Sequence, residues 1–167
     1  MGREAKFMVD INVAKLARWL RMMGYDAVIF NGDDDWRMVV TALAEGRIII
    51  TKDTQVMKRG VITSGRLKAV LITSDVPELQ IQQVIQALNL DSHFRPFTIC
   101  LECNQPLIER DKEEVRGRVP PYVFQTQDQY RECPSCHRIY WKGTHWQAMK
   151  QMLEKFRAGP TGGSPLP

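Results

Sequence analysis

The chain has 167 residues, of which 44% are hydrophobic and 25% are charged, and its formal net charge is +4. This length fits one ordinary domain with at most a small attached module, and the composition excludes a chain that is disordered throughout. No apolar run approaches the roughly 18 residues of a membrane-spanning helix, and the N-terminus has no export signal. We therefore expect a cytoplasmic protein with no membrane partner, whose mild basic excess suits an anionic partner without requiring one.

The first ninety or so residues alternate between short apolar runs and longer segments with helical periodicity. Four apolar runs predict strands, at residues 7–9, 27–30, 47–50 and 69–72. These runs are apolar throughout, as is typical of strands that are buried on both faces of a parallel sheet. The segments between them predict helices, at residues 14–23, 36–45 and 77–90. The pattern is that of an α/β fold with a parallel sheet flanked by helices.

The four cysteines form two Cys-x-x-Cys pairs, Cys100 with Cys103 and Cys133 with Cys136. Two such pairs supply the four sulfur ligands that tetrahedral structural zinc requires, and a closed set of this kind leaves no position for a substrate. Residues 104–132 separate the pairs, which is more than the common spacing of roughly 15–20 residues. A longer loop costs little free energy, so we expect a four-cysteine zinc ribbon.

Three other uses of these cysteines are weaker. The string from Cys133 to His137 matches a haem attachment motif, but that motif leaves the first pair unexplained. A zinc deaminase needs a His-x-Glu partner, which none of the three histidines provides. A redox Cys-x-x-Cys pair is normally single. Two equivalent pairs therefore favour zinc.

The composition changes after about residue 90, where Pro, Cys and aromatic residues replace the helical periodicity. We expect an α/β domain over residues 1–95 and a zinc ribbon with a C-terminal helix over residues 96–157. Within that second module, residues 138–141 predict a strand and residues 144–157 predict the helix. Residues 158–167 are rich in Gly and Pro, and we expect a disordered tail there.

Aspartates recur where the predicted strands end. Asp10 follows the first strand, Asp53 follows the third, and three aspartates at 33–35 precede the second helix. Reactive groups of parallel sheets gather at the carboxyl ends of the strands, and carboxylates there repel one another unless a cation such as Mg²⁺ or Mn²⁺ lies among them. Such a metal can activate water against a phosphodiester. Taken singly, each aspartate is more simply explained as a cap or turn residue, with Asp35 capping the second helix.

The aspartate and cysteine patterns occur together with several longer stretches of sequence. The cysteine pairs and the segments 7–10, 16–21, 24–26, 47–53 and 140–146 resemble the Mut-seven C-terminal ribonuclease domain, a PIN-like nuclease fold followed by a zinc ribbon. The resemblance extends over roughly residues 6–156. It implies a metal-dependent ribonuclease, a hydrolase in which Asp10, Asp35 and Asp53 are the catalytic acids and Asp10 and Asp53 bind the metal. We choose Asp35 over its two neighbours because it directly precedes the helix that begins at Trp36.

The substrate implied by this resemblance is RNA. Arg18, Arg21 and Lys52 are candidate phosphate contacts, although charged residues on the outer face of a helix are usually only solvated. A second hypothesis is a zinc-ribbon module that binds RNA or protein and carries an inactive PIN-like site. A toxin-like nuclease with a cognate inhibitor would use the same residues as the enzyme hypothesis.

Overall fold

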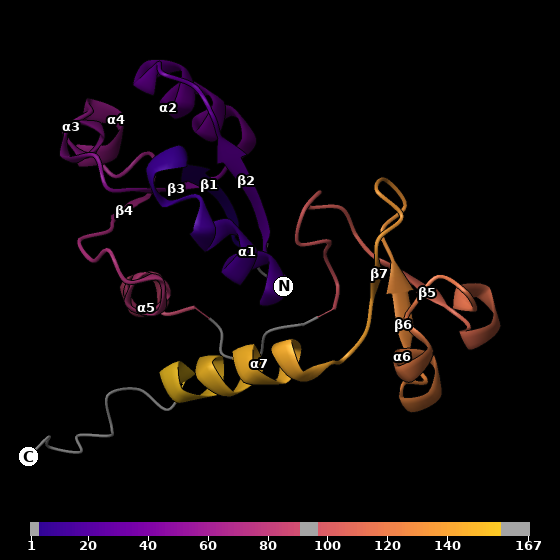
Figure 1. The fold of residues 1–167 in the computed structure, drawn as a ribbon. Helices are drawn as coiled ribbons and strands as arrows, with labels where there is room; N and C mark the ends of the chain where they lie inside the picture. Colours follow the sequence, from indigo (N-terminus) through magenta and orange to yellow (C-terminus); the bar gives the residue numbers. More distant parts are fainter. Residues whose placement is uncertain (1–3, 91–96, 158–167) are drawn as a thin grey trace, which may run out of the picture. The chain divides into compact units, whose positions relative to one another are not determined.

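The computed structural model describes residues 4–90 and 97–157 (Figure 1). The chain divides into two compact units, Met1–Asn104 and Gln105–Pro167, and each has its own sheet. The predicted boundary between residues 95 and 96 and the predicted tail at 158–167 lie outside the described residues, so both stay predictions. Of the helices in these described ranges, none combines the length and the apolar character needed to cross a membrane.

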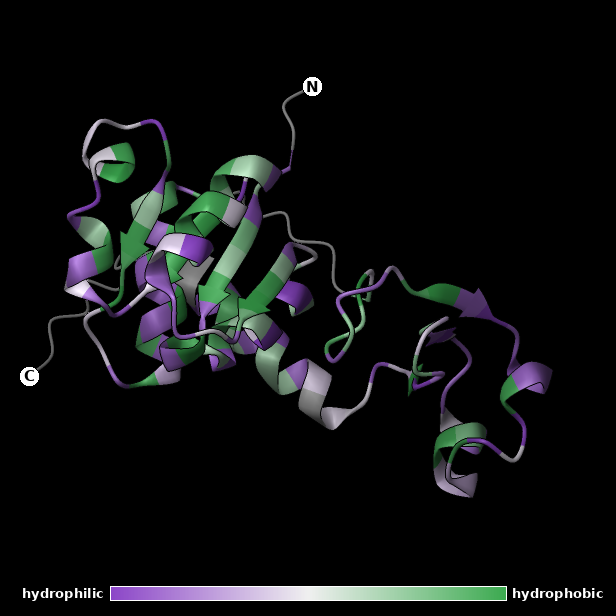
Figure 2. Cartoon of the chain, turned by 90° about the horizontal axis from the view of Figure 1, so that it is seen from above, coloured by the Kyte–Doolittle hydropathy of each residue, from purple (hydrophilic) through white to green (hydrophobic). Residues whose placement is uncertain are grey.

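The first unit is built on a four-stranded parallel sheet in the order β2-β1-β3-β4. The strands are β1 (Lys6–Asp10), β2 (Asp26–Phe30), β3 (Ile48–Thr51) and β4 (Ala69–Leu71). All three neighbouring pairs run parallel, which confirms the predicted sheet. Figure 2 shows these strands largely in the hydrophobic colour. Such apolar runs are typical of strands in a parallel sheet that has helices on both faces.

Helices cover both faces of this sheet. On one side α1 (Lys15–Met22), which follows the short turn η1 (Ile11–Val13), packs against α5 (Pro77–Leu88). On the other side lie α2 (Asp35–Glu45), α3 (Thr54–Met57) and α4 (Gly60–Thr63). Alternating strand residues point to opposite faces of the sheet. The core on the side of α2, α3 and α4 is formed by Met8, Met38, Val39, Ala42, Ile49, Val56 and Leu67.

Local chemistry sets the ends of the long helices. The Asp34 side chain accepts hydrogen bonds from the backbone N–H groups of Trp36 (3.0 Å) and Arg37 (3.3 Å), which begins α2 one residue before the predicted start. Gly46 ends α2 in the left-handed conformation (φ 68°), where a side chain would be strained. Pro77 occupies the first position of α5, where its missing N–H has no helical partner to lose.

The second unit contains a three-stranded antiparallel sheet in the order β5-β6-β7. Its elements are β5 (Ile108–Arg110), η2 (Lys112–Val115), α6 (Pro121–Thr126), β6 (Tyr130–Glu132), β7 (Ile139–Tyr140) and α7 (Thr144–Arg157). The predicted helix over residues 144–157 is confirmed, and the predicted strand at 138–141 is shortened to two residues. A small core of Val115, Val119, Val123 and Tyr130 supports the sheet.

A buried carboxylate organises the turn between β6 and β7. The side chain of Glu132 is 7% exposed and accepts hydrogen bonds from Arg118 (2.8 Å) and Arg110 (3.2 Å), while His137 Nδ1 lies 3.0 Å from its other oxygen. Hydrogen bonds from Arg118 and His137 lower the pKa of Glu132 to about 2. The carboxylate therefore stays charged and holds both ends of the segment that contains Cys133 and Cys136.

The loop that carries the first cysteine pair is fastened to the α/β sheet. Arg21, whose exposure is 6%, donates from Nε to the Ala27 carbonyl (2.9 Å) and from Nη1 to the Leu101 carbonyl (2.7 Å). The Asn104 side chain accepts from the Ala27 N–H (3.0 Å) and donates to Asp26 Oδ1 (2.7 Å). Since these bonds are largely shielded from water, they fix the loop against β2.

The two arginines of α1 should therefore differ in their effect on stability. We expect Arg21→Met to lower the free energy of unfolding by about 1–3 kcal/mol, because carbonyl groups lose a buried donor. Arg18 forms an ion pair with Glu102 and its side chain is 49% exposed, so Arg18→Met should cost less than about 1 kcal/mol. Urea unfolding followed by far-UV circular dichroism measures both; equal losses in the two variants would contradict the buried role of Arg21.

Candidate functional site

The carboxyl ends of β1 and β3 bring together two of the predicted aspartates. Asp10 is the last residue of β1 and is 6% exposed, and Asp53 lies two residues beyond the end of β3. Asp53 also begins α3, because its Oδ1 accepts a hydrogen bond from the Gln55 N–H (2.8 Å). The two carboxyl groups therefore lie at one edge of the sheet, as expected for parallel strands.

A buried threonine connects the two aspartates. Thr51, the last residue of β3, has no exposed surface. Its hydroxyl donates to Asp10 Oδ2 (2.7 Å) and accepts from the backbone N–H of Asp53 (3.0 Å). The sequence analysis missed this residue, although a hydroxyl at the end of the apolar run 48–50 is a signal that could have drawn attention to it. One hydroxyl thus fixes both the side chain of Asp10 and the backbone of Asp53.

Asp35 completes the cluster from the start of α2. The neighbouring Asp34 takes the capping role, so the carboxyl group of Asp35 is not used as the helix cap. Partial burial raises the pKa of Asp35, and the hydrogen bond and negative charge of Asp53 and the charge of Asp10 raise it further. The three carboxyl groups therefore interact electrostatically.

The predicted phosphate contacts have different surroundings. Lys52 directly precedes Asp53 in the sequence. Its ammonium group forms an ion pair with Asp75, whose side chain is 88% exposed. Arg18 pairs with Glu102 at the surface. The guanidinium of Arg21 is buried and donates to backbone carbonyls. Lys52 and Arg18 thus pair with surface carboxylates, whereas Arg21 holds the cysteine loop through backbone carbonyls.

The four predicted cysteines come together. Their Sγ atoms all lie within 4.8 Å of one another, close to the separation of about 3.8 Å that tetrahedral Zn–S bonds of about 2.3 Å require. Backbone N–H groups point at two of the sulfurs: that of Cys103 at Cys100 (3.4 Å), and those of Ser135 (3.4 Å) and Cys136 (3.5 Å) at Cys133. This cluster is therefore suited to a metal such as zinc.

The aspartates are less tightly gathered than the sulfurs. Within residues 4–90 and 97–157, the ligand atoms of the four cysteines lie close enough together to surround one ion. The carboxyl oxygens of the three aspartates in these ranges do not. Asp53 already uses one oxygen as a helix cap. A cation at the aspartates would therefore draw their side chains closer together than they lie in this structure.

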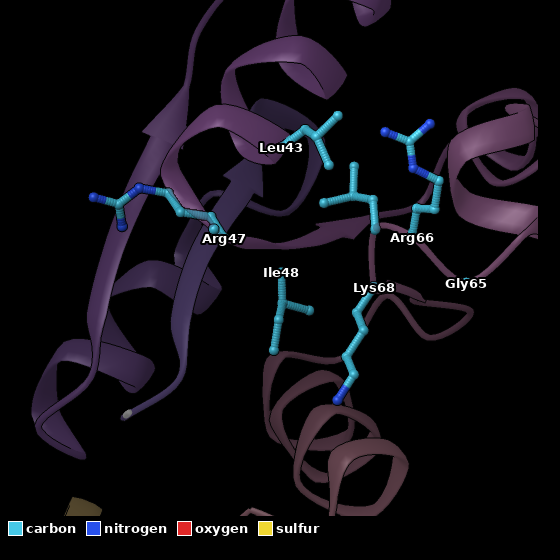
Figure 3. A pocket seen from close by; sticks show the side chains of 8 residues that line it. Leu43, Arg47, Ile48, Gly65, Arg66 and Lys68 are labelled. Carbon is cyan, nitrogen blue, oxygen red and sulfur yellow. The ribbon is translucent and has the colours of Figure 1, made fainter. Parts of the chain in front are cut away.

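A pocket of about 270 Å³ lies at the opposite edge of the sheet (Figure 3). It is lined where β3 and β4 begin, by Leu43, Gly46, Arg47, Ile48, Gly65, Arg66, Leu67 and Lys68. The Arg47 guanidinium pairs with Asp26 (2.8 Å) and Glu45 (2.7 Å). None of the predicted site residues lines this pocket, so the aspartates do not lie in it.

Comparison with protein families gives one match that covers most of the chain. The model of the Mut7-C RNAse domain matches residues 5–153, a range that includes the three aspartates and the four cysteines. The chain belongs to this family. Neither a curated protein nor a solved structure matches the chain. Membership of the Mut7-C RNAse family indicates a nuclease-like role with RNA as the substrate.

The raised pKa of Asp35 predicts a specific pH dependence of stability. Between the ordinary pKa and the raised value the folded protein binds more protons at Asp35 than the unfolded chain, so the free energy of unfolding falls as pH rises through this interval. Asp35→Asn removes this fall. We expect the free energy of unfolding of the variant, relative to that of the unmodified protein, to increase as pH rises above the ordinary pKa of an aspartate when no divalent metal is added, as measured by urea unfolding at several pH values.

Asp33→Asn is the matched control, because Asp33 is an exposed residue of the same loop. The difference in free energy of unfolding between Asp33→Asn and the unmodified protein should change little over the same pH values. A difference between Asp35→Asn and the unmodified protein that is independent of pH would show that the three carboxyl groups are not electrostatically coupled.

Proposed function

We propose that the chain is a metal-dependent ribonuclease that hydrolyses RNA phosphodiester bonds at Asp10, Asp35 and Asp53. The observation that supports this most directly is the Thr51 hydroxyl, which joins the Asp10 carboxylate (2.7 Å) to the backbone N–H of Asp53 (3.0 Å) at the carboxyl edge of a parallel sheet. A cluster of like charges that the fold maintains at a strand edge is a typical sign of a functional site. The Mut7-C RNAse family supplies RNA as the substrate class.

The aspartates have the chemistry that a hard divalent cation needs. Carboxylate oxygens are preferred ligands of Mg²⁺ and Mn²⁺, and a cation offsets the repulsion among neighbouring carboxylates. Asp10 and Asp53 would bind the metal, and Asp35 would complete or orient the site. When bound, the metal lowers the pKa of a water molecule and neutralises charge on the phosphate.

The residues of the chain contribute orientation and binding. The Thr51 hydroxyl holds Asp10 Oδ2 in place and keeps the other oxygen of that carboxylate for the cation. The Asp53 side chain keeps its direction through the hydrogen bond from Gln55. Lys52 and Arg18 would bind phosphates of the RNA backbone in exchange for Asp75 and Glu102.

The second metal in this proposal is structural Zn²⁺, bound by Cys100, Cys103, Cys133 and Cys136. The closed set of four sulfurs supports zinc and leaves no coordination position for a substrate. Four cysteines that serve as metal ligands and form no disulfides also fit a reducing compartment, which supports the cytoplasm as the location of the protein.

The competing function is an RNA- or protein-binding module with an inactive aspartate cluster. The capping role of Asp53 and the looser gathering of the three carboxyl groups favour it. Both functions use the same fold, so only an activity measurement with defined variants separates them.

Cleavage of a mixture of single-stranded and structured RNA tests the enzyme. We expect cleavage that requires Mn²⁺ or Mg²⁺, and we expect Asp10→Asn to abolish it, because the variant keeps the shape of the side chain but loses its charge. Thr51→Val should lower the rate by about 10–100-fold, since it frees the ligand that the hydroxyl orients. The measurement is the cleavage rate on labelled RNA, with circular dichroism to verify folding.

Two matched controls accompany these variants. Asp33→Asn removes a carboxylate from an exposed loop, and Thr41→Val removes a hydroxyl that bonds only within α2, to the Arg37 carbonyl. Both should cleave RNA at the unmodified rate. If the unmodified protein cleaves no RNA with either metal, the enzyme is overturned. If Asp10→Asn cleaves as fast as the unmodified protein, the aspartate cluster is not the site of cleavage.

Removal of one zinc ligand tests the second metal. We expect one zinc ion per chain by elemental analysis, and we expect Cys133→Ser to lose it and to unfold the ribbon while the α/β sheet stays folded. Ser135→Ala, which alters the same turn without removing a sulfur, should keep the metal. Stoichiometric zinc in Cys133→Ser would contradict the assignment.

A further inference from the structure

A large aromatic side chain is exposed directly beside the aspartate cluster. Trp36 follows Asp35 in the first turn of α2, and 56% of its surface is exposed. An exposed indole offers an aromatic face on which another ring can stack.

The backbone of Trp36 is fixed in the same way as that of Asp35. The Asp34 carboxylate accepts the Trp36 N–H (3.0 Å), and the Asp34 carbonyl accepts the N–H of Met38 (3.1 Å), whose side chain is fully buried. Asp35 and Trp36 therefore belong to one capped helical turn that is anchored in the core. The backbone of the turn that carries both side chains is therefore held in place.

A cation lies at the same place. The Arg59 guanidinium carbon is 5.8 Å from the centroid of the Trp36 ring, in a cation–π contact. Arg59 comes from the junction between α3 and α4, directly after the helix that Asp53 begins. An aromatic ring and a guanidinium from two different elements thus meet at the start of α2, one residue after Asp35.

We propose that Trp36 and Arg59 form a subsite that stacks one unpaired nucleobase and binds its phosphate next to the scissile bond, so that the protein prefers single-stranded RNA. The identity of the polymer rests on the proposed function. A nucleobase stacks on an indole whatever its sequence, because every base has a π-face. In a duplex both faces of each base are covered by neighbouring bases, so a paired strand cannot use this ring without unstacking.

The two side chains would contact different parts of a nucleotide. Arg59 lies over the ring of Trp36, and the exposed fraction of the indole leaves area for a base. A guanidinium is suited to bidentate hydrogen bonding with phosphate while it remains stacked on an aromatic face. Trp36 would therefore recognise the base, and Arg59 would recognise the backbone.

Binding measurements on three probes test this division. Asp10→Asn serves as the parent protein, so that no probe is cut, and fluorescence anisotropy is measured without added divalent metal. The probes are an unstructured RNA of about 12 nucleotides, its perfect duplex, and an abasic ribose-phosphate strand of the same length. Adding Trp36→Ala should weaken binding of the single-stranded RNA by about 10-fold and leave the duplex and abasic strands unchanged. Trp36→Phe, which keeps an aromatic face, should retain most of the affinity.

Two further variants complete the test. Arg59→Gln should weaken binding of both the single-stranded RNA and the abasic strand, because its contact is to phosphate. Tyr122→Ala is the matched control, since Tyr122 is an aromatic residue of the second unit that is 74% exposed, and it should bind all three probes like the parent. Equal affinity of Trp36→Ala and its parent for the single strand, or an equal loss on all three probes, would overturn the subsite.

The outcome separates this inference from the proposed function. If the unmodified protein cleaves no RNA but Trp36→Ala loses affinity for the single strand alone, the subsite stands and the enzyme does not. If the unmodified protein cleaves RNA and Trp36→Ala cleaves and binds single strands as well as before, the enzyme stands and the subsite does not. If the Asp10→Asn parent binds none of the three probes, the subsite is overturned.

Discussion

The parallel pairing of β1 with β3 is the constraint on which the rest of the α/β unit depends. In this register Val9 lies opposite Ile50, so the two strands end side by side and Asp10 meets the Thr51 hydroxyl across 41 residues of sequence. The same hydroxyl receives the Asp53 N–H, and Asp53 in turn raises the pKa of Asp35. The apolar strand interiors thus supply the free energy that keeps three like charges close together at the sheet edge.

Much of the fold could be predicted because its signals are local and strong. Uninterrupted apolar runs marked the parallel strands, and helical periodicity marked α1, α2, α5 and α7. The helices α3, α4 and α6 span only four to six residues, too few to show a period. In the second unit, β5 and β6 are three residues long and contain charged side chains whose partners are distant in sequence, so no pattern along the chain could identify them.

The site shows the same division. The cysteine cluster was predictable because each Cys-x-x-Cys pair is a local motif whose metal chemistry does not depend on the loop between the pairs. Arg21 was not, because a helical wheel places it on the polar face of α1 and contains no information about the loop at 101–104 that covers it. Thr51 and the choice between Asp34 and Asp35 depend on hydrogen bonds that only the folded chain defines.

Three consecutive residues at the start of α2 have three different roles. Asp34 caps the helix, Asp35 joins the carboxyl cluster and Trp36 presents its ring to solvent. Each added or removed residue turns the following side chains of a helix by about 100° about its axis. A substitution at one of these positions alters one role, whereas an insertion or deletion inside the triplet misdirects the remaining two at once. Length variation among homologues should therefore be absent between Asp34 and Trp36, even where the residue types differ.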